Sequence, residues 1–357
     1  AVKHVGGMDS LLNKLDALMG SDAVHNSTLK FIPPVPIDDI TTLTFWESPF
    51  SKFIIFITVM WWSHHGTDGG GYIIQRMSSA KNERHALLAT LWFNLAHYAL
   101  RVWPWIIVAV VSIVRFPLIP EAYNDLGVKA GYPLVMNNLL GPGLKGILIV
   151  SFLAAFMSTI DTHLNWGASY LVNDIYKRFY KPNASESHYV IVGKIFTVVL
   201  MILAAFTAMK MQSISKAWEF IFSMGAGIGL VLILRWFWWR VNAWSEITAL
   251  STSIVVTFLL EVIAYSQTIS SNQDYNLFGS APILFGLKLQ VHHKLMIIVP
   301  IAIISWITVT LLTKPEPNTT LAKFYKKVQP GGWWGPINQN YEHTLQPVSK
   351  GFFILWL

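Results

Sequence analysis

Long apolar stretches, separated by short polar or basic connections, dominate the chain. A helix needs about 20 mostly apolar residues to cross the hydrocarbon core of a bilayer. Seven stretches meet this requirement, at residues 52–75, 87–114, 145–172, 188–209, 217–239, 244–266 and 293–313. The pattern predicts an all-α membrane protein, in which residues 1–50 form an extracellular loop segment, residues 51–350 a single helical bundle, and residues 351–357 the start of a truncated further helix.

Basic residues gather in alternate connections between these stretches. They are Arg76, Lys81, Arg84, Lys177, Arg178, Lys181, Arg235, Arg240, Lys314, Lys323, Lys326 and Lys327. Because cytoplasmic loops carry an excess of Lys and Arg, this alternation places these connections in the cytoplasm. Residues 1–50, 115–144 and 267–292 are then expected outside, where small amphipathic pieces such as "GYPLVMNNLLGPG" can lie across a pathway.

The composition supports lipid as the solvent, with 53% hydrophobic and 13% charged residues and a mean hydropathy of +0.46. The formal charge of +7 is scattered in short clusters, so a nucleic-acid partner is not expected. The absence of Cys excludes disulfides and thiolate metal sites. The chain opens on a polar segment without Met and stops inside an apolar run, so we expect both ends to be truncated.

The first apolar stretch contains a break beside His64, His65 and Asp68. Four glycines interrupt it: Gly66, Gly69, Gly70 and Gly71. Irregular backbone at membrane depth is tolerated only beside a cavity or other protein, and transporters use such breaks to bind ions and substrates. The pattern favours a broken helix, although the glycines can also mark the inner end of an ordinary helix.

Polar side chains inside the third apolar stretch are the strongest chemical signal. An ionised Asp at a helix centre costs about 2.5–3.5 kcal/mol on insertion scales, so Asp161 is expected to face water or protein. The hydroxyls of Ser158 and Thr159, with the carbonyl of Ala155, offer three neutral oxygens to a small cation. Alternatively, the hydroxyls bond to carbonyls one turn earlier or join two helices. Thr162 extends the row by another turn.

Three segments carry a family resemblance: "AAFMSTIDTHLNWGASYLVNDIY" at residues 154–176, "QRMSSAKN" at 75–82 and "FWWRVN" at 237–242. In order and spacing they resemble the sodium:solute symporter family, which includes the sodium/glucose cotransporters. The resemblance implies a LeuT-like inverted-repeat fold of five plus five helices. This chain would supply the second repeat and additional C-terminal helices, and the missing N-terminal repeat would be its partner.

The resemblance also implies a sodium site. Family members hold a shared sodium ion with two hydroxyls and a preceding carbonyl, which correspond to Ser158, Thr159 and Ala155. Members that bind an additional sodium use hydroxyls one turn on, at the positions of Asp161 and Thr162. The Asp departs from that pattern, so a proton-linked or structural role competes with a second ion.

A substrate cavity is expected around two helices. His97 falls where sugar-transporting members carry a Lys that faces the cavity, and Arg101 lies four residues further on the same helix face. Such a pair suits an anionic or strongly polar solute. As an alternative, Arg101 pairs with Asp161 or another buried carboxylate as a structural bridge, and His97 is a core residue whose polar groups are satisfied.

Further cavity residues follow from the resemblance and the broken helix. Trp218 falls near the position at which sugar-binding members have a substrate-contacting Gln, and Glu219 lies beside it. The aromatic gate of the family falls near the positions of Trp61 and Trp62. His64 and Asp68 complete the expected cavity. The glycines of "GAGIGL" at residues 225–230 are interpreted as close helix packing, because no strand precedes them.

The leading hypothesis is secondary active transport, not an enzyme. Sodium, as a transported co-substrate, and a small polar solute (sugar, sugar acid, amino acid or carboxylate) bind and are exposed alternately to each side, without an organic cofactor. The alternatives are a proton-coupled transporter, a receptor or channel, and an intramembrane transferase using His64, His97 or His163 with Asp161. No metal-binding H-E-x-x-H motif supports the enzyme. The expected location is a plasma membrane or bacterial inner membrane.

Overall fold

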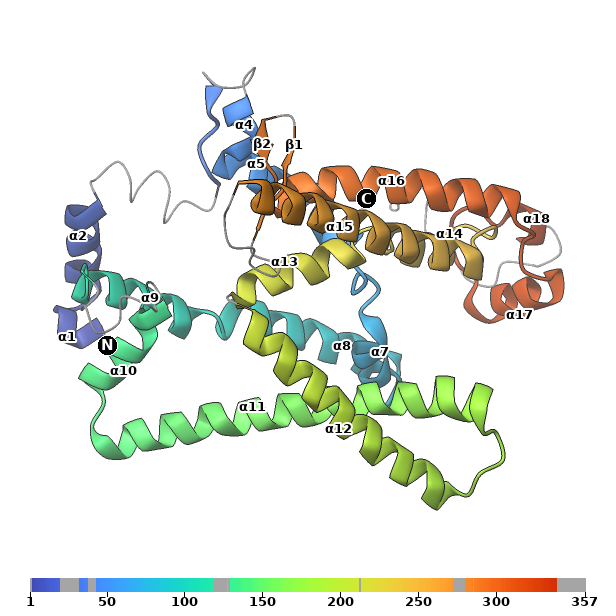
Figure 1. Ribbon diagram of the computed structural model, residues 1–357, viewed down its shortest axis with the longest axis horizontal. Coiled ribbons are helices and arrows are strands. Elements are labelled where there is room, and N and C mark those ends of the chain that lie inside the picture. Colours follow the sequence, from blue (N-terminus) through green and yellow to red (C-terminus); the bar gives the residue numbers. More distant parts are fainter. Residues whose placement is uncertain are drawn as a thin grey trace. The chain divides into compact units, whose positions relative to one another are not determined.

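The computed structural model describes residues 2–19, 32–37, 43–118, 127, 129–211, 213–271, 280–284 and 286–338. Almost all the secondary structure in this part of the chain is helical (Figure 1). The chain divides into two compact units, residues 1–31 with 87–210 and residues 32–86 with 211–357, and each is described by itself. The predicted all-α class is confirmed, whereas the inverted repeat stays a prediction.

Six helical segments in the described residues are long and apolar enough to cross a membrane. They are Glu83–Arg115, Pro142–Tyr180, Glu186–Lys210, Ile214–Phe237, Ala243–Ser270 and Val291–Leu312. Each overlaps one of the seven predicted stretches. The prediction of residues 351–357 as a further helix lies outside the described residues.

The remaining stretch, residues 52–75, is not one continuous span. An apolar helix covers Pro49–Ser63, and a second helix begins at Gly70 after an irregular segment. Gly69 and Gly70 have φ angles of 90° and 60°, which glycine adopts with little strain. The prediction of a broken helix is therefore confirmed.

The first unit contains two long helices that pack against each other, α11 and α12. Gly167 allows this approach, since a Cβ there would meet Leu200 at 3.0 Å. A smaller core joins α2, α9 and α10 through Leu11, Val111 and Val135. The elements with residues in this unit are α1 (Val2–Val5), α2 (Met8–Met19), α8 (Glu83–Asn94, from Leu87 onwards), π-helix η4 (Leu95–Leu100), α9 (Trp103–Arg115), α10 (Gly131–Leu139), α11 (Pro142–Tyr170), π-helix η6 (Leu171–Tyr180) and α12 (Glu186–Lys210).

The second unit is built around α15 and α16, which lie side by side (Figure 1). Its elements are α4 (Leu43–Glu47), α5 (Pro49–Ile55), π-helix η3 (Phe56–Met60), α6 (Trp61–Ser63), α7 (Gly70–Ser78), α13 (Ile214–Gly225), α14 (Gly229–Phe237), α15 (Ala243–Ser270), strands β1 (Ile283–Leu284) and β2 (Leu287–Lys288), α16 (Val291–Leu312), α17 (Asn318–Val328) and α18 (Gly335–Asn338). The two strands form a short antiparallel pair.

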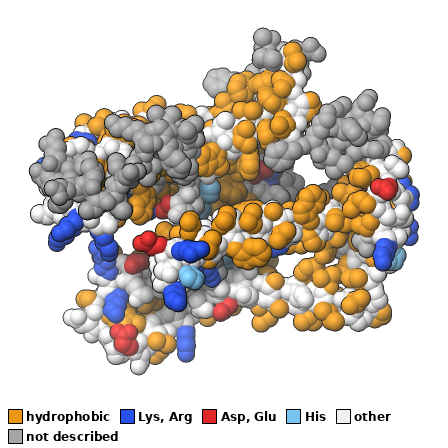
Figure 2. Space-filling view, turned by 180° about the vertical axis from the view of Figure 1, so that it is seen from behind, with side chains coloured by type: hydrophobic (Ala, Val, Ile, Leu, Met, Phe, Trp, Pro, Cys, Tyr) orange, Lys and Arg blue, Asp and Glu red, His pale blue; other side chains and the backbone are white. Residues whose placement is uncertain are grey.

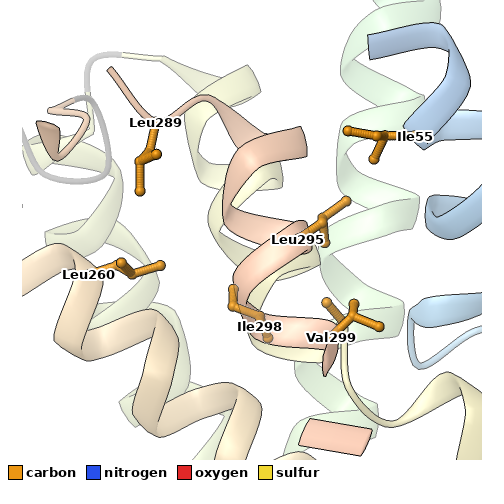
Figure 3. Packing of buried hydrophobic residues seen from close by; sticks show 7 residues of the cluster. Ile55, Leu260, Leu289, Leu295, Ile298 and Val299 are labelled. Atoms are coloured by element: carbon orange, nitrogen blue, oxygen red, sulfur yellow. The ribbon is translucent and has the colours of Figure 1, made fainter. Parts of the chain in front are cut away.

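The core of the second unit anchors the helix that leads into the break. Ile55 of α5 packs in one cluster with Leu295, Ile298 and Val299 of α16 and with Leu260 of α15 (Figure 3). Leu295 and Ile298 are at most 1% exposed. Burial of these side chains fixes the end of α5, from which η3 and α6 lead to the irregular segment.

Apolar side chains also cover much of the outer surface (Figure 2). In the most apolar window of Pro142–Tyr180, and likewise of Glu186–Lys210, no residue is buried. Ile147 on α11 and Phe206 on α12 are 67% and 64% exposed. Surfaces of this kind are suited to contact with lipid or with further membrane helices.

Candidate cation and solute site

Helix α11 brings two oxygens of the predicted cation site into contact and carries Ser158 on the same turn. The Thr159 hydroxyl donates a hydrogen bond of 2.9 Å to the Ala155 carbonyl, and that of Thr162 donates one of 2.9 Å to the Ser158 carbonyl. These are the back-bonds that are common for Thr in helices. A hydroxyl that donates its proton keeps lone pairs to offer to a cation, so these bonds and ion binding are compatible. Within the described residues, the Ser158 hydroxyl itself has no hydrogen bond.

The carboxylate of Asp161 lies one turn beyond Ser158. Residues three apart on a helix share a face, so Asp161 and Ser158 are neighbours along α11. Asn165, one turn further on, donates a hydrogen bond of 2.9 Å to the Asp161 carboxylate. All these side chains are exposed in the first unit. The neutral oxygens are therefore followed along the helix by a carboxylate and amide pair.

His97 and Arg101 share a helix face, as their spacing predicts. The Arg101 guanidinium lies 3.1 Å from His97 Nε2 and 5.2 Å from the centre of the Trp105 ring. Because an arginine can only donate, the His97 nitrogen accepts this bond. No ion pair joins Arg101 to Asp161 in the part of the chain that the structure describes. The predicted structural bridge between them is not formed.

The broken helix of the second unit satisfies its freed backbone groups locally. The Thr67 hydroxyl donates to the carbonyls of Trp62 and His64, each at 2.7 Å. The Asp68 carboxylate accepts a 3.0 Å hydrogen bond from the backbone of Gly70, at the start of α7. These contacts hold the irregular segment in one conformation.

Asp68 also joins the break to α14 and, through Arg235, to α15. Its second oxygen lies 2.6 Å from the guanidinium of Arg235, which also forms a 2.9 Å ion pair with Glu246 of α15. Asp68 and Trp236 line the same cavity of about 680 Å³. The carboxylate predicted for the solute cavity is thus already neutralised by a protein cation.

Aromatic rings connect two more predicted cavity residues. Phe222 of α13 contacts His64 and Trp218, with ring centres 6.0 and 5.7 Å apart respectively. Glu219, beside Trp218, forms a 2.7 Å ion pair with Lys216.

The remaining two predicted cavity residues lie at the end of the helix before the break. Trp61 is 37% exposed, and the indole of Trp62 donates to the Thr58 carbonyl. Of the predicted cavity residues in the second unit, His64 and Trp218 share an aromatic neighbour, which is Phe222.

The predicted residues are divided between the two units. The cation set, His97 and Arg101 belong to the first unit, and all the others belong to the second. No group of three or more His, Asp or Glu residues in the described ranges is placed to hold a metal ion. The arrangement offers hydroxyl, carbonyl and aromatic groups for binding ions and polar molecules.

Two polar features of the second unit were missed from sequence. Lys294 and Glu261 form a 2.9 Å ion pair, with side chains only 10% and 8% exposed. Both His292 and His293 contact the carbonyl of Trp46, at 2.9 and 2.8 Å. The signal that could have found the ion pair is a carboxylate deep inside one apolar stretch followed by a lysine at the start of the next.

The span-capable helices, their exposed apolar surfaces and the polar groups on their faces define a multi-pass integral membrane protein. Comparison with known proteins adds the family. The sodium:solute symporter family model matches residues 1–255. The chain belongs to the sodium:solute symporter family, as the resemblance predicted.

The names of similar proteins differ in the solute that they give. The chain is 25% identical over 284 residues to sodium/glucose cotransporter 4 of Danio rerio, covering 73% of this chain and 40% of that protein. It is 31% identical over 139 residues to the sodium/proline symporter of Haemophilus influenzae, covering 38% and 27%. Sodium/myo-inositol cotransporter 2 of Oryctolagus cuniculus is 25% identical over 285 residues, covering 73% and 41%. The chain thus spans less than half the length of these relatives.

Proposed function

We propose that this protein is a secondary active transporter that couples the movement of sodium to that of a small polar solute. The observation that carries the proposal is the oxygen group of α11, where the Thr159 hydroxyl lies 2.9 Å from the Ala155 carbonyl and Ser158 belongs to the same helical turn. Hard cations such as sodium prefer neutral and anionic oxygen ligands of this kind. Names of the relatives that combine sodium with a transported solute support this proposal.

The rest of the sodium site is proposed to come from a segment outside this chain. A turn of one helix offers too few ligands to replace the hydration shell of an ion. In a LeuT-like inverted repeat, a discontinuous helix of the N-terminal repeat would supply the others. The exposed polar face of α11 is available for such a neighbour.

Solute binding is proposed at the broken helix and at the His97 and Arg101 pair. Discontinuous helices place backbone carbonyl and amide groups near the bilayer midplane, where transporters bind their substrates. His64 and Trp218 would offer aromatic surface to the solute, and Arg101 would favour a polar or anionic group. This chemistry suits a sugar, sugar acid, amino acid or carboxylate.

Proton coupling is the second candidate, because a carboxylate lies one turn from the oxygen group. Asp161, held by Asn165 at 2.9 Å, would then bind a proton in place of an additional sodium. No covalent chemistry is required in either case. We further propose a plasma membrane or bacterial inner membrane as the location.

Uptake by the full-length protein in sealed vesicles tests the proposal. Radiolabelled glucose, proline and myo-inositol would each be offered with an inward sodium gradient, with potassium in place of sodium, and with an inward proton gradient. We expect accumulation of at least one solute class in the sodium arm alone. Accumulation driven by protons without sodium would support the second candidate, and uptake that no gradient drives would contradict both.

A further inference from the structure

Helix α17 carries a basic face that points away from the protein. Leu321 and Tyr325 are buried in a cluster with Trp334 and Ile337. At about 100° per residue, the lysines of the helix fall on the opposite side from these two residues. These exposed lysines are Lys323, Lys326 and Lys327.

Within the part of the chain that the structure describes, the three lysines have no acidic partner. Helix α17 contains no Asp or Glu. None of the ion pairs formed there includes these lysines. Three cationic groups are therefore held on about two turns of helix without neutralisation by the described residues.

Helix α17 is tied at both ends to membrane-spanning helices. Only residues 313–317 separate it from the end of α16, and five residues reach at most about 18 Å. After the helix, the Trp334 indole donates a 3.1 Å hydrogen bond to the Trp236 carbonyl near the end of α14. These tethers keep the lysines near the level at which the spans leave the bilayer.

The segments next to α17, at the end of α14 and before α18, present aromatic and cationic groups suited to a bilayer surface. Trp333 and Trp236 are 55% and 39% exposed. Trp is enriched at membrane interfaces because its ring is apolar while its N–H is polar. The guanidinium of Arg240 lies at 5.8 Å over the Trp239 ring, and its Nε is buried without a hydrogen-bond partner in the described structure. Exposed Trp side chains distinguish this surface from one that meets only water.

We propose that the basic face of α17, with Trp333 and Arg240 beside it, binds the headgroups of anionic phospholipids in the leaflet on this side of the membrane. Clustered Lys and Arg residues next to a membrane span attract anionic lipid through the negative surface potential. The exposed Trp rings suit the interfacial region, so a phospholipid fits this surface better than a soluble phosphate does. The inference stands independently of the transported solute.

Lipid binding to the detergent-solubilised full-length protein tests the proposal. Native mass spectrometry would be used to titrate phosphatidylglycerol, phosphatidylcholine and inorganic phosphate separately. We expect tight binding of phosphatidylglycerol only, and about 100-fold weaker binding in the triple variant Lys323→Gln, Lys326→Gln, Lys327→Gln. Because the three side chains are exposed, this variant is expected to keep the unfolding temperature of the wild type in detergent.

The chain offers a matched control in another three-residue basic cluster. The variant Lys177→Gln, Arg178→Gln, Lys181→Gln removes the same charge from the end of η6 and the residue that follows it, and is expected to retain phosphatidylglycerol affinity. Equal losses in the two triple variants would overturn the proposal, since net charge alone would then explain binding. Equal affinity of the wild type for the two lipids, or for inorganic phosphate, would overturn it as well.

Discussion

Glu261 and Lys294 form a buried ion pair, and burial decides how each of them affects stability. Their side chains are about as buried as the apolar core around them, yet both carry formal charges. Removing one partner from a buried ion pair leaves an uncompensated charge, whereas replacing both with apolar groups is often neutral. The pair therefore stabilises the packing of α15 against α16 only while both charged side chains are present.

At the residue scale, we predict that Lys294→Met destabilises the protein by about 3–5 kcal/mol. The double variant Glu261→Leu, Lys294→Met is expected to recover most of that loss, because no buried charge remains. Unfolding in SDS, followed by circular dichroism, measures both. The control is Lys177→Met, which breaks an exposed pair with Glu186 and should cost less than about 1 kcal/mol. A double variant as unstable as the single one would contradict this account.

Sequence could identify single polar residues but not their long-range partners. The oxygens of Ala155, Ser158 and Thr159 were predictable because all three lie within one helical turn. In contrast, Arg235 and Asp68 are 167 positions apart, and the pairing of Asp68 depends on how α14 packs against the break. The same reason explains why the Lys294 and Glu261 pair was missed.

At the level of elements, two helix breaks in the second unit contact each other. α13 ends at Gly225 and α14 begins at Gly229, so a short turn separates them. The α-carbon of Gly229 is packed directly against the backbone of Trp62 and Ser63, at the end of α6. A side chain at this position would collide with backbone atoms, which cannot move aside as the tip of a flexible side chain can.

We predict that Gly229→Ala lowers the yield of folded protein and its unfolding temperature, because its Cβ would overlap the Trp62 carbonyl oxygen. Gly146→Ala in α11 is the control. No atom lies within 4 Å of its Cβ position, and Ala favours a helix interior over Gly by about 1 kcal/mol. Size-exclusion chromatography and thermal unfolding in detergent compare the two. Equal stability in both variants would show that the two breaks are not packed as the structure has them.

The elements themselves were largely predictable from the length and apolar character of each stretch. Six predicted stretches overlap helices able to span a membrane, because backbone groups in lipid must be satisfied within the helix. The glycines at residues 66–71 also predicted the position of the break. The structure has the break at this position, where Gly69 and Gly70 adopt left-handed φ angles.

For the whole molecule, membership of the sodium:solute symporter family connects these local features to transport. The match over residues 1–255 includes the broken helix, the oxygen group of α11 and the His97 and Arg101 pair. The family alone does not choose the solute, since relatives are named for glucose, proline and myo-inositol. The cation is the feature common to these names, so it gives the sharper test.

Equilibrium binding of radioactive sodium to the purified full-length protein tests the sodium site most directly. We predict that Ser158→Ala weakens sodium binding by about tenfold, because it removes one oxygen ligand while leaving the helix intact. Ser151→Ala is the control, since the Ser151 hydroxyl is on the same helix and donates 2.8 Å to the Ile147 carbonyl. Ser151→Ala should bind sodium as the wild type does. Unchanged sodium affinity in Ser158→Ala would contradict the account.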